Sequence, residues 1–239
     1  MEETALFKTF WHWSPETNWP PASITHIKDL RSFDRLNLTI TQTDLPANQQ
    51  KKLVNMWCEL IPKLTEVKYL WFTSRVSQDI FDAACELKNL QGLFIKWSGI
   101  KSIDKITKLT NVRRLHIGSS TQIESIEPLT SLKNLQVLAL INLQKIQDYS
   151  VLASLIDLRE LTITGDVWAP KVLKIETLKP LTALKKLRHL DLDCTRILDG
   201  YYEPLIELKE IESLRISRNL TDDVRLRLNK HLIRLQTKL

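Results

Sequence analysis

Residues 132–140 read LKNLQVLAL, and this stretch decides the fold because its apolar positions recur along the chain. Leucine occupies its first, fourth, seventh and ninth positions. The seventh-position residue, Leu138, has counterparts in six similar segments: Leu70, Leu93, Leu115, Leu161, Leu190 and Leu214. Neighbouring copies are 23, 22, 23, 23, 29 and 24 residues apart, and a degenerate eighth copy spans residues 30–38. Such regular spacing predicts a repeat protein in which each copy is one structural unit.

The pattern within each copy predicts a stacked coil. Its last three positions place two core apolar residues on either side of a variable one, and this period of two is typical of a short strand. One strand cannot bury its apolar face alone, whereas stacked copies bury a continuous core behind a parallel sheet. Pro128, Pro180 and Pro204 each precede a leucine between two copies. Proline cannot donate to a strand ladder, so these segments belong to the return arms, which we expect to be mostly 3₁₀ turns.

Over residues 27–219, the spacing and the Pro-Leu step resemble the internalin-like class of leucine-rich repeats. The resemblance implies an α/β solenoid of about eight repeats, an open horseshoe with a concave parallel sheet and short 3₁₀ or helical convex arms. It says little about a partner. The class usually has Asn five residues after the third leucine, where this chain has Arg75, Ser98, Ser120, Leu143, Asp166, Thr195 and Asn219. Ser and Thr hydroxyls replace the amide in part, whereas Arg75 and Leu143 predict irregular turns.

The ends of such an array need covering, because they otherwise expose core residues. Residues 220–239 form the expected C-terminal cap, with a helix over 221–236 that begins at Thr221 and two acidic residues. Residues 45–62 have helical apolar spacing and are the expected return arm of the first copy. Residues 1–26 are the expected N-terminal cap segment. Their tryptophans, Trp11, Trp13 and Trp19, suit a hydrophobic lid.

Composition restricts the class of protein. The chain has 239 residues, 43% of them hydrophobic, and its three cysteines stand far apart among apolar neighbours. Reduced, buried thiols predict a reducing compartment. Residues 1–13 lack the basic segment and apolar run of a signal peptide, and no stretch is long enough to span a membrane. These observations predict a cytoplasmic protein with no membrane partner.

The residues flanking each core pair predict where a partner binds, because they point out of the concave face. On adjacent strands we expect an aromatic cluster of Tyr69, Trp71 and Phe94, with Lys96, Arg114 and His116 beside it. Val137, Ala139 and Ile141 continue it as an apolar strip, while Glu160, Asp191 and Asp193 make the far end acidic. Exposed aromatic patches mark interaction sites, and Trp, Tyr and Arg are favoured at their centres. The alternative is that the N-terminal segment folds over Trp71 and Phe94.

A second candidate anchor lies in the long repeat. The interval between Leu161 and Leu190 is about six residues longer than its neighbours, and the extra residues include Trp168. Loops carry function more often than the scaffold, so Trp168 is a candidate partner-binding residue. An insertion whose tryptophan packs on the coil is the equal alternative.

No known catalytic motif and no cofactor site is recognisable in the chain. His189, Asp191 and Asp193 alternate on one strand, but steps of about 6.5–7 Å are too wide for a metal site. The C-terminal third carries most of the excess positive charge, and eight of its basic residues are candidates for a nucleic-acid interface: Lys185, Lys186, Arg188, Arg225, Arg227, Lys230, Arg234 and Lys238. Their mixture with acids favours a solvated surface over a nucleic-acid interface.

The sequence therefore predicts a non-catalytic module that binds another protein through its concave face. The basic residues Lys96 and Arg114 favour a partner with an acidic rim. One candidate role is a bacterial immunity or inhibitor protein that occludes a toxin or enzyme. The alternatives are an adaptor or regulatory subunit of an enzyme complex and, less favoured, a nucleic-acid binder.

Overall fold

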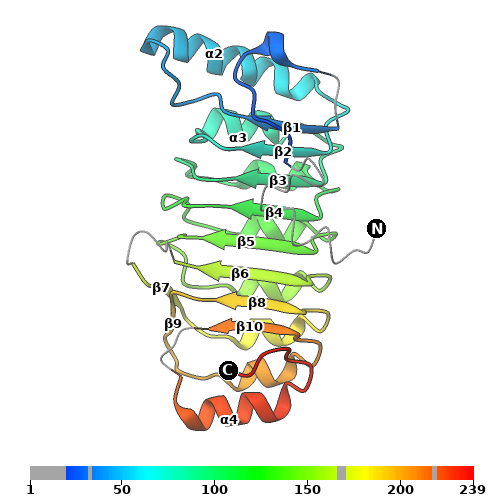
Figure 1. Cartoon of the computed structure of the whole chain (residues 1–239), viewed down its shortest axis with the longest axis vertical. Coiled ribbons are helices and arrows are strands. Elements are labelled where there is room, and N and C mark those ends of the chain that lie inside the picture. Colours follow the sequence, from blue (N-terminus) through cyan, green and yellow to red (C-terminus); the bar gives the residue numbers. More distant parts are fainter. Residues whose placement is uncertain (1–19, 32–33, 166–170, 217–219) are drawn as a thin grey trace.

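The computed structural model describes residues 20–31, 34–165, 171–216 and 220–239, and within them eight strands form one parallel sheet. The strands are β1 (Arg35–Leu38), β2 (Tyr69–Phe72), β3 (Gly92–Ile95), β4 (Arg114–Ile117), β5 (Val137–Ile141), β6 (Glu160–Thr164), β8 (His189–Leu192) and β10 (Ser213–Ile216). They stack in chain order along the long axis of the molecule (Figure 1). The predicted open solenoid with its concave parallel sheet is confirmed.

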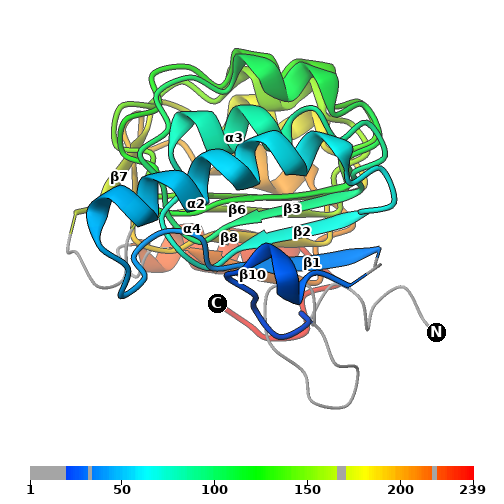
Figure 2. The same cartoon turned by 90° about the horizontal axis from the view of Figure 1, so that it is seen from above.

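The return arms lie on one side of the sheet (Figure 2). The first two contain α2 (Ala47–Leu60), followed by a 3₁₀ turn at Ile61–Lys63, and α3 (Gln78–Ala84). The next five contain 3₁₀ helices, η3 (Asp104–Lys108), η4 (Glu127–Ser131), η5 (Ser150–Ser154), η6 (Lys179–Ala183) and η7 (Glu203–Glu207). The predicted 3₁₀ arms and the helix expected over 45–62 are confirmed. No helix in the described residues is both long enough and apolar enough to cross a membrane.

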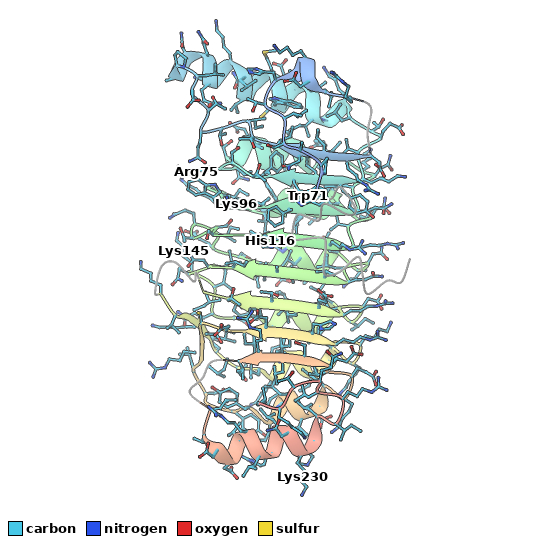
Figure 3. All side chains as sticks on the ribbon, in the orientation of Figure 1. Trp71, Arg75, Lys96, His116, Lys145 and Lys230 are labelled. Carbon is cyan, nitrogen blue, oxygen red and sulfur yellow. The ribbon has the colours of Figure 1, made fainter. Side chains whose placement is uncertain are left out.

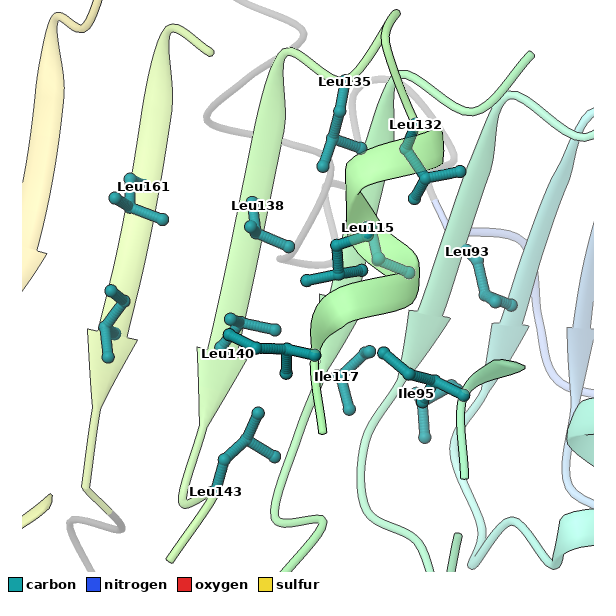
Figure 4. Packing of buried hydrophobic residues seen from close by; sticks show 14 of the residues in the cluster. Leu93, Ile95, Leu115, Ile117, Leu132, Leu135, Leu138, Leu140, Leu143 and Leu161 are labelled. Carbon is teal, nitrogen blue, oxygen red and sulfur yellow. The ribbon is translucent and has the colours of Figure 1, made fainter. Parts of the chain in front are cut away.

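The core lies between the sheet and the return arms. In the middle repeats, Leu115, Leu138 and Leu161 occupy equivalent positions on paired strands, and each is at most 1% exposed. Figure 4 shows these side chains and those of Leu132 and Leu135 pointing into the space between strands and η4. Each repeat therefore buries its leucines against the next, as the repeat pattern predicts.

Hydroxyl groups join neighbouring repeats at the turns after the strands. The hydroxyls of Ser98 and Ser120 are 2.6 Å apart, and the Ile100 amide donates to Ser98 Oγ. Where Arg75 fills the usual Asn position, the preceding Ser74 accepts from the Ile40 and Thr41 amides instead. Small hydroxyl side chains thus satisfy buried backbone groups that would otherwise lose their hydrogen bonds.

Residues 20–30 cover the N-terminal end of the described array. Ile24 adds a parallel bridge beyond β1, donating to the Asn37 carbonyl and accepting from the Thr39 amide. A 3₁₀ turn follows at Ile27–Asp29. The indole of Trp57 on α2 donates to the Thr25 carbonyl over 2.8 Å. Residues 1–19, including Trp11, Trp13 and Trp19, lie outside the described residues, as do Phe33, Asp166 and Asn219.

The C-terminal helix, α4 (Asp222–His231), begins where the sequence predicts but ends five residues before the predicted end at 236. Thr221 caps it by accepting from the Val224 amide. After His231 the chain turns back, and the Gln236 amide donates to the Glu212 carbonyl over 2.9 Å. This bond continues the ladder in which the Glu212 amide donates to the Arg188 carbonyl, so the last residues cover the sheet edge instead of extending the helix.

The long repeat contributes a second, smaller sheet. β7 (Leu173–Ile175) pairs in parallel with β9 (Thr195–Ile197) beyond the ends of the main strands. Trp168, the candidate anchor in this insertion, lies outside the described residues.

Candidate functional site

The strand register brings most of the predicted site residues together on the concave face. Trp71, Phe94 and His116 occupy one row on β2, β3 and β4, and Ala139 of β5 continues it. The Phe94 and His116 rings stack with centroids 4.4 Å apart. Figure 3 shows Trp71 and His116 over the sheet and Lys96 nearer the edge where the strands end. The predicted grouping therefore holds for the residues on β2 to β5.

The expected exposure of four of these side chains is wrong. Trp71 is 2% exposed, Arg114 6%, Val137 2% and Ala139 4%. Trp71 lies outside the main core, in a separate cluster against which Tyr69 and Phe94 pack. Strand alternation tells which face a side chain occupies but not how much of that face is covered. The part that these residues play toward a partner stays a prediction.

The remaining candidates keep accessible surface. Tyr69, Phe94, His116 and Ile141 are half-buried, and Lys96 is exposed. Thr162 on β6 is also half-buried and faces the same side. These residues form an accessible strip of mixed aromatic, apolar and polar character. A fixed backbone beneath the strip suits binding, because little conformational entropy is lost when a partner docks.

Charged groups cross the concave face in the neighbouring row. Gly92 of β3 has no side chain, so it leaves space between Tyr69 on β2 and Arg114 on β4, which lie in its row. Burial lowers the pKa of Arg114, and nearby Tyr69 opposes this effect. Burial raises the pKa of Glu160 on β6 to about 7, and the charge of Arg114 opposes that rise. For the Glu160 carboxyl, the effect of burial on the pKa therefore outweighs the opposing charge of Arg114.

Glu160 should make stability fall as pH rises. Its pKa is about 4.5 in an unfolded chain and about 7 in the folded protein, so between these values the folded protein binds more protons. The free energy of unfolding should therefore drop across this window by up to about 3 kcal/mol. Replacing Glu160 with Gln should flatten this dependence in denaturant titrations at several pH values. An unchanged slope would contradict the assignment, and the exposed Glu127→Gln change is the matched control.

The acidic end of the concave face is partly neutralised by Arg215. Arg215 on β10 contacts Asp191 Oδ2 at 3.0 Å and Asp193 Oδ2 at 2.9 Å. The Asp193 amide also donates to Asp191 Oδ1. The two carboxylates are therefore held by a guanidinium, and among the described residues no His, Cys, Asp and Glu side chains gather into a group that could hold a metal ion. This role of Arg215 could have been predicted from the sequence, because the repeat register places Arg215 beside Asp191.

Five of the eight basic residues named in the C-terminal third are paired with acids. Ion pairs join Lys185 to Glu207, Lys186 to Asp157, Arg188 to Glu212, Arg227 to Glu203 and Asp223, and Arg234 to Glu210. Because their charges are balanced by acids, these residues attract the phosphates of a nucleic acid less strongly than their number suggests.

The row-based prediction missed the turns that follow the strands. Arg75 and Trp97, in the turns after β2 and β3, are both exposed. Only strand positions were considered as candidates, apart from Lys96 and Trp168. The sequence did contain a signal for these residues. Arg75 occupies the position where the repeat class usually has Asn, and Trp97 directly precedes that position in the next repeat.

Comparison with known proteins places the chain in a family. A family model described as a leucine-rich repeat region matches residues 18–237. The structure resembles that of internalin C2 from Listeria monocytogenes, with 26% identity, a TM-score of 0.59, and coverage of 74% of this chain and 72% of that one.

It also resembles a leucine-rich-repeat protein from Leptospira interrogans, with 19% identity and a TM-score of 0.62. That match covers 90% of this chain but only 51% of the other, so this chain spans about half the length of the Leptospira protein. No curated protein sequence matches the chain. Together with the confirmed repeat register, the family match shows that this chain belongs to the leucine-rich-repeat family, with repeats of the internalin-like class.

Proposed function

We propose that this chain is a non-catalytic module that binds another protein through its concave face. Leucine-rich-repeat regions generally mediate protein–protein interaction and are typically non-enzymatic. The observation that carries the proposal is the stacked pair Phe94 and His116, half-buried on a rigid sheet with exposed Lys96 beside it. Packing of the repeats does not require aromatic rings on the face opposite the core, whereas binding sites favour them.

In its finer form, the proposal is that the partner is a toxin or enzyme whose surface the array occludes. The similar structure of internalin C2 is that of a bacterial protein, which supports a bacterial source. The three cysteines are free thiols, which supports a cytoplasmic location. An adaptor in an enzyme complex would bind its partner through the same face. The two roles differ in their effect: occlusion inhibits the bound enzyme, whereas an adaptor leaves it active.

Affinity capture from lysate tests the concave face directly. The wild-type chain should retain a partner that the double variant Phe94→Ala, His116→Ala loses. Truncating a central aromatic costs about 2 kcal/mol or more, which corresponds to roughly thirtyfold weaker binding. Ile156→Ala is the matched control, since Ile156 is 58% exposed on a return arm. Retention of the partner by the double variant would contradict the proposal.

An assay of the captured partner then separates the two roles. If the partner is an enzyme, adding the wild-type chain should inhibit it under occlusion, and the double variant should not. Undiminished activity in the complex would contradict occlusion and favour the adaptor role.

A further inference from the structure

Three basic residues stand in the segments that follow β2 and β3. Arg75, Lys96 and Lys101 are exposed, and no ion pair joins them to an acid within the described part of the chain. Figure 3 shows Arg75 and Lys96 along the edge where these strands end, with Lys145 farther along it. The Lys101 amide donates to Gln78 Oε1 over 3.0 Å, which ties the chain after β3 to the first residue of α3 in the arm after β2. Glu124 is held by its ion pair with Lys145.

The return arms show a different charge arrangement. There, a basic residue commonly meets an acid from the neighbouring repeat, as Lys105 meets Asp82 at 2.8 Å and Lys185 meets Glu207 at 3.3 Å. The repeat period makes such pairs simple to form, because equivalent positions stack. The edge after β2 and β3 therefore keeps uncompensated positive charge, which attracts an anionic surface and speeds encounter.

Trp97 lies among these charges and is 37% exposed. The structure describes two other tryptophans, Trp57 and Trp71, and both are at most 2% exposed. Tryptophan beside basic side chains is the combination found at the energetic centre of many protein interfaces. Nothing in the core requires so large a side chain at this turn, where Ile95 and Ser98 supply the buried contacts.

The turn that holds Trp97 is rigid. The Trp97 carbonyl accepts from the Val76 amide at 3.1 Å, and the Gly99 amide donates to the Val76 carbonyl at 2.9 Å. Gly99 also leaves room for Arg75, since a Cβ at Gly99 would stand 3.0 Å from Arg75 Nη2. The backbone of this turn is therefore positioned before any partner arrives, which lowers the entropic cost of binding.

We propose that Arg75, Lys96, Lys101 and Trp97 form a second docking surface, the edge surface, for an acidic segment of a partner protein. Lys96 connects it to the concave strip, because it follows β3 directly after Phe94 and Ile95. The inference rests on the proposed function in one respect, that the partner is a protein. A single exposed aromatic with three cations suits an acidic peptide segment better than a nucleic-acid strand, whose binding uses a longer basic groove with several stacking aromatics.

Peptide selection on the full chain tests the edge surface. The probe is a phage-displayed library of random short peptides, selected against the wild-type protein and then synthesised for titration by fluorescence anisotropy. The selected peptides should be rich in Asp and Glu. Their affinity should fall roughly tenfold or more for Trp97→Ala and for the triple variant Arg75→Ala, Lys96→Ala, Lys101→Ala.

The matched control removes the same charge elsewhere. Lys133→Ala, Lys179→Ala, Lys209→Ala changes three exposed lysines of the return arms and should alter affinity by no more than about twofold. Equal losses in both triple variants would show a net-charge effect and overturn the inference. Melting curves of every variant establish that it is folded before its titration is interpreted.

Other outcomes separate this inference from the proposed function. Selected peptides that lack acidic residues, or no selected peptides, would overturn the edge surface. Peptides that lose affinity with Phe94→Ala but not with the edge variants would support the concave face and overturn the edge surface. A single-stranded nucleic acid that displaces the peptides and binds more tightly would overturn the assignment of a protein partner.

Discussion

Truncating Leu138 to alanine should lower the free energy of unfolding by about 2–5 kcal/mol. Leu138 is 1% exposed and stands between Leu115 and Leu161 in the central strands of the sheet. The cavity left by truncation cannot close easily, because both neighbouring strands are fixed in register. In a repeat array each unit contacts mainly its neighbours, so the loss should extend to β4 and β6.

Urea titration measures the total loss, and hydrogen exchange locates it. Ile156→Ala is the control, since Ile156 is 58% exposed, and its change should stay within about 0.5 kcal/mol. A Leu138→Ala protein that unfolds like the parent would mean that the strand register is displaced by at least one residue.

Truncating Trp71 to alanine should also destabilise the fold, by about 3–5 kcal/mol. This expectation differs from the sequence-based prediction, in which Trp71 belongs to an exposed aromatic cluster on the concave face. At 2% exposure its side chain is buried on the concave side, where Tyr69 and Phe94 pack against it. Removing it takes away most of the apolar contact in that cluster.

Thermal melting of the Trp71→Ala and Phe94→Ala variants compares the stability lost when a buried and a half-buried member of the same cluster are truncated. The Phe94 variant should lose less stability, because part of its ring is already exposed to water. A Trp71→Ala protein with an unchanged melting temperature would restore the reading of Trp71 as an exposed anchor.

The sequence was sufficient to predict the sheet because the repeat pattern and the strand register carry the same information. Leu36, Leu70 and Leu93 are paired across β1, β2 and β3, as their positions in the repeat require. A one-residue slip would place leucines on the wrong face, so the apolar pattern permits one register. The same register and the alternation of faces along each strand predict the rows of the concave face on which the candidate site lies.

Other features depend on contacts that a repeat pattern does not contain. The burial of Trp71 depends on what covers the concave face, and the early end of α4 depends on the bond between Gln236 and Glu212. The pairing of β7 with β9 joins an insertion to the turn of the next repeat. Trp97 lies in a turn, where the direction of a side chain follows from the local backbone geometry and not from the alternation of faces along a strand. Its exposure could therefore not be predicted from the repeat pattern.

The central claim is that the concave strip binds a partner protein, and hydroxyl-radical footprinting of the captured complex tests it most directly. The method reports the solvent exposure of individual side chains with and without the partner. The account predicts that the partner lowers modification of Phe94, His116 and Ile141, while Met56 and Ile156, exposed on the return arms, react as in the free protein. Protection confined to Met56 and Ile156, with an unchanged concave strip, would contradict it.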